Sequence, residues 1–198
     1  MRRSREDTAD TRRRIVEAAS RLFRAKGIAS VSVADVMGSL GLTVGGFYRH
    51  FESKDALVAE AIEAASLETT ARHALAKDRP RDERASAVLD AYLSPFHRAH
   101  AERGCPVAAL CSEVGHESRS TREAFTSALR RLLAAVDELT ADEDKAKRKK
   151  VLQTAASMVG AVALSRATTD EALAKELLDA VREGLETKPR IRKGAPKP

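Results

Sequence analysis

Cysteine, aromatic residues and long apolar runs are all scarce in this sequence. The cysteines are Cys105 and Cys111, too few in 198 residues for a disulfide-stabilised scaffold. Tryptophan is absent and aromatic residues make up 4% of the chain, while alanine, leucine, arginine and glutamate dominate. This composition favours helices over strands.

The sequence also lacks the segments that direct a chain to a membrane. No apolar run approaches the roughly 20 residues needed to span a bilayer, and the longest candidate, Ala155 to Leu164, is too short. The first residues stay polar as far as Arg14 and have no apolar signal-peptide core. We therefore expect a cytoplasmic protein that makes no membrane contact.

The motifs of common enzyme classes are missing as well. We find no nucleophile elbow, no metal-binding helix signature and no glycine-rich phosphate loop, so we expect neither an enzyme nor a cofactor. His97 and His100 are spaced to share a metal ion on one helix, but no third ligand stands at a convincing spacing. We therefore predict no metal site.

The net charge of +6 is concentrated at the two ends of the chain. Residues 1–55 carry 11 basic and 7 acidic side chains, residues 56–187 carry 19 and 22, and residues 188–198 carry 5 and none. A basic head on a mildly acidic body is typical of a nucleic-acid contact surface. The basic residues at the C-terminus indicate a disordered, solubilising tail.

Apolar residues recur at helical spacing, and no strand-like alternation occurs. Ser32 to Asp35 has the pattern of a capping box, as do 120–123 and 168–171, while Pro106 suits a first helical position. Thr43 and Ser53 stand where two further helices begin. The predicted helices end at Gly27, then cover 32–41, 43–51, 53–76, 82–101, 106–114, 120–139, 145–166 and 170–186. We predict an all-α fold of about nine helices with short connections.

Three short helices in the first 51 residues, with Gly41 in the turn between the second and third, have the pattern of a helix-turn-helix. Glycine suits that turn because it has no Cβ to strain. Val36, Leu40, Val44 and Phe47 supply the apolar contact between the two helices. The third helix then presents small and polar residues to the major groove of DNA: Thr43, Gly45, Gly46, Tyr48, Arg49 and His50.

Three blocks of sequence carry a family resemblance. They are residues 11–27, residues 31–36 and the stretch 41–57, which contains Phe47-Tyr48-Arg49-His50-Phe51. Over about residues 11–60, without a gap, the chain resembles the TetR (tetracycline-repressor) family of transcriptional regulators. Met37-Gly38 and Phe47 depart from the usual family residues, and Gly38 is expected to weaken its helix by up to about 1 kcal/mol.

The resemblance implies DNA-binding roles for the residues that match the family motif. Thr43 and Val44 would touch base edges or a thymine methyl group, and Tyr48 and His50 would reach phosphates. Helix N-termini attract anions, so phosphate contacts are also expected at two helix starts. The predicted DNA-binding residues are Ser32, Thr43, Val44, Gly45, Gly46, Tyr48, Arg49, His50 and Lys54. Arginines in the arm, among them Arg2, Arg3, Arg5, Arg12, Arg13 and Arg14, would add non-specific affinity.

The resemblance also sets the expected domain order. We predict a basic disordered arm at 1–10, a helix-turn-helix DNA-binding domain at 11–55, a helical effector-binding and dimerisation domain at 56–187 and a basic disordered tail at 188–198. The last two predicted helices would form a homodimer, since they combine small residues such as Gly160 with apolar ones such as Leu164 and Leu173. The residues predicted to line an effector pocket are Tyr92, Phe96, His97, His100, Cys111, His116, Phe125 and Met158.

Cys105 stands directly before Pro106, in the predicted N-cap position of a helix. A thiol there feels the positive end of the helix dipole, and Arg103 is close by, so its reactivity would rise. The block Gly104-Cys105-Pro106 resembles TetR-type regulators that sense electrophiles or oxidants through a cysteine. A small buried structural cysteine is the other interpretation. A bond to Cys111 is not expected, because six helical residues rise about 9 Å.

The predicted function is sequence-specific DNA binding by a homodimeric transcriptional regulator, a repressor that a small-molecule effector releases from its double-stranded DNA operator. The alternative is a thiol-based repressor that an oxidant or electrophile switches through Cys105.

Overall fold

The computed structural model describes residues 5–74, 80–140 and 147–186. Within these residues the chain is helical and has no strand, which confirms the all-α prediction. The helices are α1 (Arg5–Lys26), α2 (Val33–Ser39), α3 (Val44–Phe47), α4 (Lys54–Ala74), α5 (Arg81–Tyr92), α6 (Pro95–Ala99), the 3-10 helix η1 (Ala101–Arg103), α7 (Pro106–Leu110), the 3-10 helix η2 (Val114–His116), α8 (Arg119–Leu139), α9 (Lys147–Ala167) and α10 (Glu171–Glu186). Arg2, Arg3 and the predicted tail at 188–198 lie outside the described residues.

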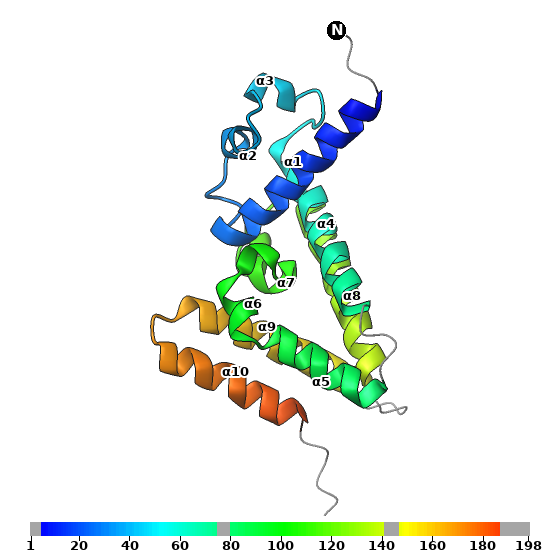
Figure 1. Cartoon of the computed structure of the whole chain (residues 1–198), viewed down its shortest axis with the longest axis vertical. Coiled ribbons are helices and arrows are strands. Elements are labelled where there is room, and N and C mark those ends of the chain that lie inside the picture. The colour runs from blue at the N-terminus through cyan, green and yellow to red at the C-terminus, as the bar shows by residue number, and fades with distance from the viewer. Residues whose placement is uncertain (1–4, 75–79, 141–146, 187–198) are drawn as a thin grey trace, which may run out of the picture.

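The helices divide the molecule into two ends. Figure 1 shows α1, α2 and α3 at one end and α10 at the other, with α4 and α8 running together between them. Helix α9 packs against α8 and α10, and the short elements η1 and α7 lie against α1. Helix α4 contacts both α1 and α8, so it connects the end that contains α1 with the rest of the fold.

The core runs without a break through both ends. In α1 and α3 it contains Ile15, Phe23 and Phe47, each 1% exposed or less. The same cluster continues through Leu57 of α4 to Met158 of α9. Burial of each such side chain contributes roughly 1.5–3 kcal/mol to the free energy of unfolding. No helix in the described parts of the chain is long and apolar enough to cross a membrane.

Helix α1 begins at Arg5, so residues 5–10 are not part of a disordered arm as the sequence predicted. Acidic residues in its first turn, Glu6 and Asp7, suit the positive end of the helix dipole. The Thr11 hydroxyl donates to the Asp7 carbonyl (2.8 Å), and Arg13 pairs with Asp10 at 2.5 Å. These local contacts extend the helix beyond the apolar face that the sequence pattern detects.

Several predicted helix starts are confirmed, and others are wrong. Ser32 and Asp35 form the predicted capping box, and the Ser53 hydroxyl accepts from the amide of Ala56 at 3.1 Å. Two starts shift by a residue or two, because a better acceptor stands nearby. Ser118 caps α8 in place of Ser120, and Asp170 caps α10 through the amides of the next turn in place of Thr168.

The helix predicted at 82–101 is two helices separated by a break at Ser94. Pro95 follows, and proline cannot donate the amide hydrogen bond that would continue α5. The Ser94 hydroxyl instead accepts from the amide of His97 and starts α6. The break turns the chain, so that α6 and η1 return towards α1.

The turn after α1 depends on Gly27. Its φ is +85°, and a Cβ added there would lie 2.6 Å from Oε1 of Glu113. The Glu113 carboxylate also accepts from the amide of Ile28 at 2.7 Å. Only glycine accommodates both the left-handed conformation and the close carboxylate.

We predict that Gly27→Ala lowers the free energy of unfolding by about 1–3 kcal/mol, because alanine is strained at this φ and displaces Glu113. Gly38→Ala is the matched control, since a Cβ at Gly38 meets nothing within 4 Å. In helix α2 that change should leave stability unaltered or raise it by up to about 1 kcal/mol. Urea unfolding followed by circular dichroism measures both. Equal stability of the two variants would contradict the account of Gly27.

Candidate DNA-binding surface and ligand cavity

Helices α2 and α3 form a helix-turn-helix. The turn contains Gly41 at a φ of +68°, as the sequence predicted, and the Leu42 amide donates to the Met37 carbonyl at 2.9 Å. Val36 and Phe47 are fully buried and hold the two helices together. The ring of Phe47 also stacks on Phe51, with centroids 5.4 Å apart. These contacts fix the inner side of α3 and leave its outer side facing solvent.

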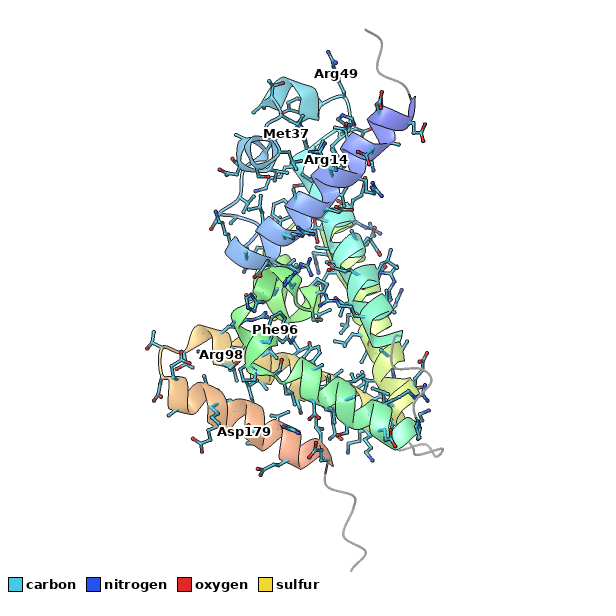
Figure 2. The ribbon with its side chains drawn as sticks, in the orientation of Figure 1. Arg14, Met37, Arg49, Phe96, Arg98 and Asp179 are labelled. Atoms are coloured by element: carbon cyan, nitrogen blue, oxygen red, sulfur yellow. The ribbon has the colours of Figure 1, made fainter. Side chains whose placement is uncertain are left out.

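The outer side of α3 is made of exposed residues. Val44 is 43% exposed and Tyr48 is 67% exposed, whereas both are of types usually buried at least in part. Thr43, Gly45 and Arg49 are exposed as well, and Figure 2 shows Arg49 pointing away from the helices. Thr43 occupies the N-cap position, but its hydroxyl makes no capping bond. Gly46 and His50 are half-buried beside this surface.

The other two predicted DNA-binding residues have structural contacts. The Ser32 hydroxyl and the Ser32 amide both donate to Oδ2 of Asp35 (2.6 and 2.7 Å), and these two hydrogen bonds lower the pKa of Asp35. The Ser32 hydroxyl also accepts from the Asp35 amide. The half-buried Lys54 donates from Nζ to the carbonyl of Ile28 at 2.7 Å. An ammonium group has three donors, so Lys54 keeps capacity for a second partner. Both residues hold the start of a helix in place beside α3.

Arg12 forms a structural clamp. Its guanidinium donates to both carboxylate oxygens of Glu60 at 2.5 Å and lies 4.5 Å from the centre of the Phe51 ring. The hydrogen bonds with Glu60 raise the pKa of Arg12. The sequence analysis placed Arg12 among the DNA-binding arginines of the arm. In this structure the charged group of Arg12 instead joins α1 to α4, and a DNA contact of Arg12 stays a prediction.

Two polar contacts join the helix-turn-helix end to the middle of the chain. Arg24 of α1 is buried and donates to the carbonyl of Gly104 at 2.7 Å and to Glu68 of α4 at 3.1 Å. Burial lowers the pKa of Arg24, and Glu68 offsets part of that effect. Glu113 supplies the second contact through the amide of Ile28. The sequence pattern did not identify either junction residue.

A cavity of about 280 Å³ lies between α4, α5, α6 and η1. Four of the residues predicted to form an effector pocket line it, namely Tyr92, Phe96, His97 and His100. The remaining wall comes from Thr69 and Arg72 of α4 and from Ala91, Arg103, Gly104 and Cys105. Figure 2 shows Phe96 on α6 between α7 and α5. Two lining arginines were missed, because long charged side chains are usually solvated and give no pattern.

The structure does not bring the other four predicted pocket residues to this cavity. Cys111 and His116 are exposed, Phe125 is half-buried against the core, and Met158 is buried within α9. Their helices were identified correctly, but residue type alone did not show which face of each helix points towards the cavity. None of these four residues lines this cavity, and their assignment to an effector pocket stays a prediction.

Both ring nitrogens of His97 have protein partners. Nδ1 lies 2.6 Å from the Tyr92 carbonyl, and Nε2 accepts from the Cys105 amide at 2.9 Å. A ring that accepts at Nε2 and faces a carbonyl at Nδ1 is neutral with its proton on Nδ1. The pair of His97 and His100 is therefore not arranged to bind a metal. No cluster of three metal-ligating side chains occurs among the described residues.

Cys105 is the N-cap residue of α7, as predicted, but its side chain makes no capping bond. It is 3% exposed and lines the cavity beside Tyr92. The buried structural cysteine considered in the sequence analysis matches this burial. An oxidant would have to enter the cavity to reach its sulfur.

Helices α9 and α10 each have one buried and one exposed apolar face. On α9, Leu152 and Leu164 are 45% and 58% exposed, and on α10 Leu173 is 44% exposed. A Cβ added at Gly160 or Gly184 would meet nothing within 4 Å. Other small and apolar residues of these two helices pack inside the chain, namely Ala155, Ala161, Val162 and Leu178.

The Arg12 clamp gives a prediction that separates a structural from a DNA-binding role. Arg12→Gln should lower the free energy of unfolding by about 1 kcal/mol, a figure that allows for solvent screening of this partly exposed pair. Arg13→Gln is the control, because Arg13 pairs with Asp10 on the surface of one helix. It should change stability by less than about 0.5 kcal/mol. Thermal and urea unfolding measure the free energy of unfolding of both variants. If Arg12→Gln is as stable as the wild-type protein, Arg12 has no structural role of this kind.

Comparisons with known proteins agree with the helix-turn-helix geometry. Residues 15–61 match the family described as bacterial regulatory proteins, tetR family. The chain is 36% identical over 83 residues to the HTH-type transcriptional regulator TtgR of Pseudomonas putida, a match that covers 42% of this chain and 39% of that protein. It is 29% identical over 174 residues to the uncharacterized HTH-type transcriptional regulator Rv0196 of Mycobacterium tuberculosis, covering 80% and 86% of the two chains.

Solved structures share the whole fold. A TetR-family regulator from Cytophaga hutchinsonii superposes with a TM-score of 0.76 at 22% identity, covering 94% of this chain and 95% of that one. A TetR regulator from Chloroflexus aurantiacus gives a TM-score of 0.74 at 25% identity, covering 91% and 94%. Residues 15–61 thus match the N-terminal domain of bacterial regulatory proteins of the tetR family, and the chain as a whole shares the fold of solved TetR-family regulators.

Proposed function

We propose that the protein is a homodimeric transcriptional repressor that binds operator DNA through α3 and leaves it when a small molecule occupies the cavity. The observation that carries the proposal is the outer side of α3. Val44 and Tyr48 are exposed there, while Phe47 between them is fully buried. Such a helix is held rigidly on one side and offers small, polar and aromatic groups on the other, as entry into a major groove requires.

The DNA contacts divide by chemistry. Thr43 and Val44 stand at the start of α3, where a hydroxyl and a methyl group reach base edges, so we assign them to sequence reading. Tyr48, Arg49 and the half-buried His50 are assigned to phosphates, which position a protein on DNA but carry no sequence information. Gly45 has no Cβ and lets the backbone approach the DNA. Ser32 and Lys54 flank this surface at helix N-termini.

The cavity is connected to the DNA-binding end through its own wall. Gly104 lines the cavity, and its carbonyl is bound by the buried Arg24 of α1. Beyond α7, Glu113 holds the turn that follows α1. A ligand that displaces η1 and α7 would shift both contacts and thereby the direction of α1. Release from DNA then requires only that the ligand binds the displaced conformation more tightly than the conformation that binds DNA.

The dimer is assigned to the exposed faces of α9 and α10. Leu152, Leu164 and Leu173 supply apolar area there, and Gly160 permits close approach of a second copy. A two-fold dimer presents two copies of α3 to two half-sites of the operator.

The alternative function, a thiol switch at Cys105, stays a prediction. Cys105 lines the same cavity, but its side chain is almost fully buried.

Specific DNA binding is tested with labelled DNA from upstream of the protein's own gene, against a scrambled duplex, by fluorescence anisotropy over a salt series. Wild-type protein should prefer the upstream DNA, with affinity falling steeply as salt rises. Arg49→Ala should weaken binding to both duplexes and reduce the salt slope by about 1. Arg122→Ala, an exposed arginine on α8, is the matched control. Equal binding of wild-type protein to both duplexes would contradict sequence reading by α3.

The dimer is tested by placing a charge on its proposed interface. Leu164→Glu should yield monomers in sedimentation velocity and weaken DNA binding, because a buried unpaired carboxylate is costly. Leu67→Glu is the control, since Leu67 of α4 is similarly exposed at 56% but lies outside α9 and α10. A Leu164→Glu variant that remains dimeric would exclude this face as the interface.

A further inference from the structure

The cavity has a size and shape that limit its ligand. It holds about 280 Å³, near the lower end of protein ligand sites. A cavity of roughly 150 Å³ accommodates benzene. The space between α4 and α6 therefore takes one aromatic ring with small substituents. Phe96 and Tyr92 provide aromatic surface for such a ring.

The outer wall of the cavity is positively charged. Arg72 and Arg103 line it, and no aspartate or glutamate does among the described lining residues. The nearest carboxylates already have partners. Glu68 binds Arg24 and lies 3.7 Å from Arg72, while Glu102 lies 3.1 Å from Nδ1 of His100.

Arg103 is the cation left for a ligand. Its side chain is exposed and forms no hydrogen bond or ion pair with any described residue, while its backbone carbonyl accepts from Arg72 and its backbone amide donates to the His100 carbonyl. A guanidinium presents donors in a planar fork that matches a carboxylate. The solvent side of the cavity thus fits an anionic group.

The inner end of the cavity has a different requirement. Tyr92 is 3% exposed, and its hydroxyl is buried beside the Cys105 thiol, out of reach of a molecule in the cavity. Tyr92 therefore offers a ligand the apolar surface of its ring and not its hydroxyl. The ring of Tyr92 is fixed edge-on against His97, with centroids 4.7 Å apart. His97 itself cannot serve the ligand, because its two nitrogens are bound to the protein.

We propose that the cavity binds a small aromatic carboxylate, with the carboxylate at Arg103 and the ring against Phe96 and the ring of Tyr92. The inference rests on the proposed function, in which this cavity is the effector site, and it adds the chemical class of the effector. A cationic or fully apolar ligand would leave Arg103 without a counter-charge.

Isothermal titration calorimetry on the full-length protein without DNA tests the class directly. The probes are 4-hydroxybenzoate, benzoate, benzamide and benzylamine. We expect 4-hydroxybenzoate and benzoate both to bind, benzoate to bind about tenfold more tightly than the neutral benzamide, and benzylamine not to bind. Because Arg103 is exposed, the affinity for benzoate should also fall as salt rises.

Two variants locate the carboxylate of the ligand. Arg103→Gln should weaken benzoate binding about tenfold and leave benzamide binding unchanged. Tyr92→Phe should leave the benzoate affinity unchanged, since the buried Tyr92 hydroxyl does not reach the ligand. Arg122→Gln on α8 is the control for charge.

Equal affinity for benzoate and benzylamine, benzoate affinity unaltered in Arg103→Gln, or no binding of any probe would overturn the proposal. Because the binding is measured without DNA, a failure of operator binding or release leaves these results unchanged. A negative result for the ligand class therefore does not count against the proposed DNA-binding function, and the reverse also holds.

Discussion

A buried guanidinium joins the two ends of this protein. Arg24 of α1 is enclosed by α4 and the chain after η1, where it binds the carbonyl of Gly104, the side chain of Glu68 and its own helix at Ser20. A charge this deeply buried is tolerated only while its partners stay in place, and removing one typically costs about 3–5 kcal/mol. The position of α1 therefore depends on the position of the segment that forms the cavity wall.

The remaining polar contacts extend this dependence in both directions along the chain. Glu113 binds the turn after α1, and Lys54 binds the carbonyl of Ile28 in the same turn, so the start of the helix-turn-helix is held from α4 and from the chain beyond α7. On the other side, Arg98 and Arg166 bind α6 to α9 through Ser165 and His97 carbonyls. The cavity thus lies in a region connected by hydrogen bonds to both the proposed DNA-binding surface and the proposed dimer helices.

The sequence predicted the parts that have local chemical signals. The all-α class, the Gly41 turn, the Ser32 capping box and the buried Phe47 all follow from patterns within a few residues of one another. Long-range contacts leave no such signal: Arg12 was assigned to DNA although Glu60 lies 48 positions away, and the link from Arg24 to Gly104 spans 80 positions. Half of the predicted pocket residues do not line the cavity for a related reason, because an aromatic or histidine side chain on a middle helix can face the core, the solvent or the cavity.

The claim that most directly needs testing is that occupancy of the cavity changes the affinity of α3 for DNA. The measurement is the operator affinity of the wild-type protein by anisotropy, with and without saturating 4-hydroxybenzoate, at constant ionic strength. The account predicts that the ligand weakens operator binding by roughly 5–150-fold, the usual range for coupled sites, and that operator DNA weakens ligand binding by the same factor. Superimposable DNA titrations, with calorimetry showing the cavity occupied, would contradict it.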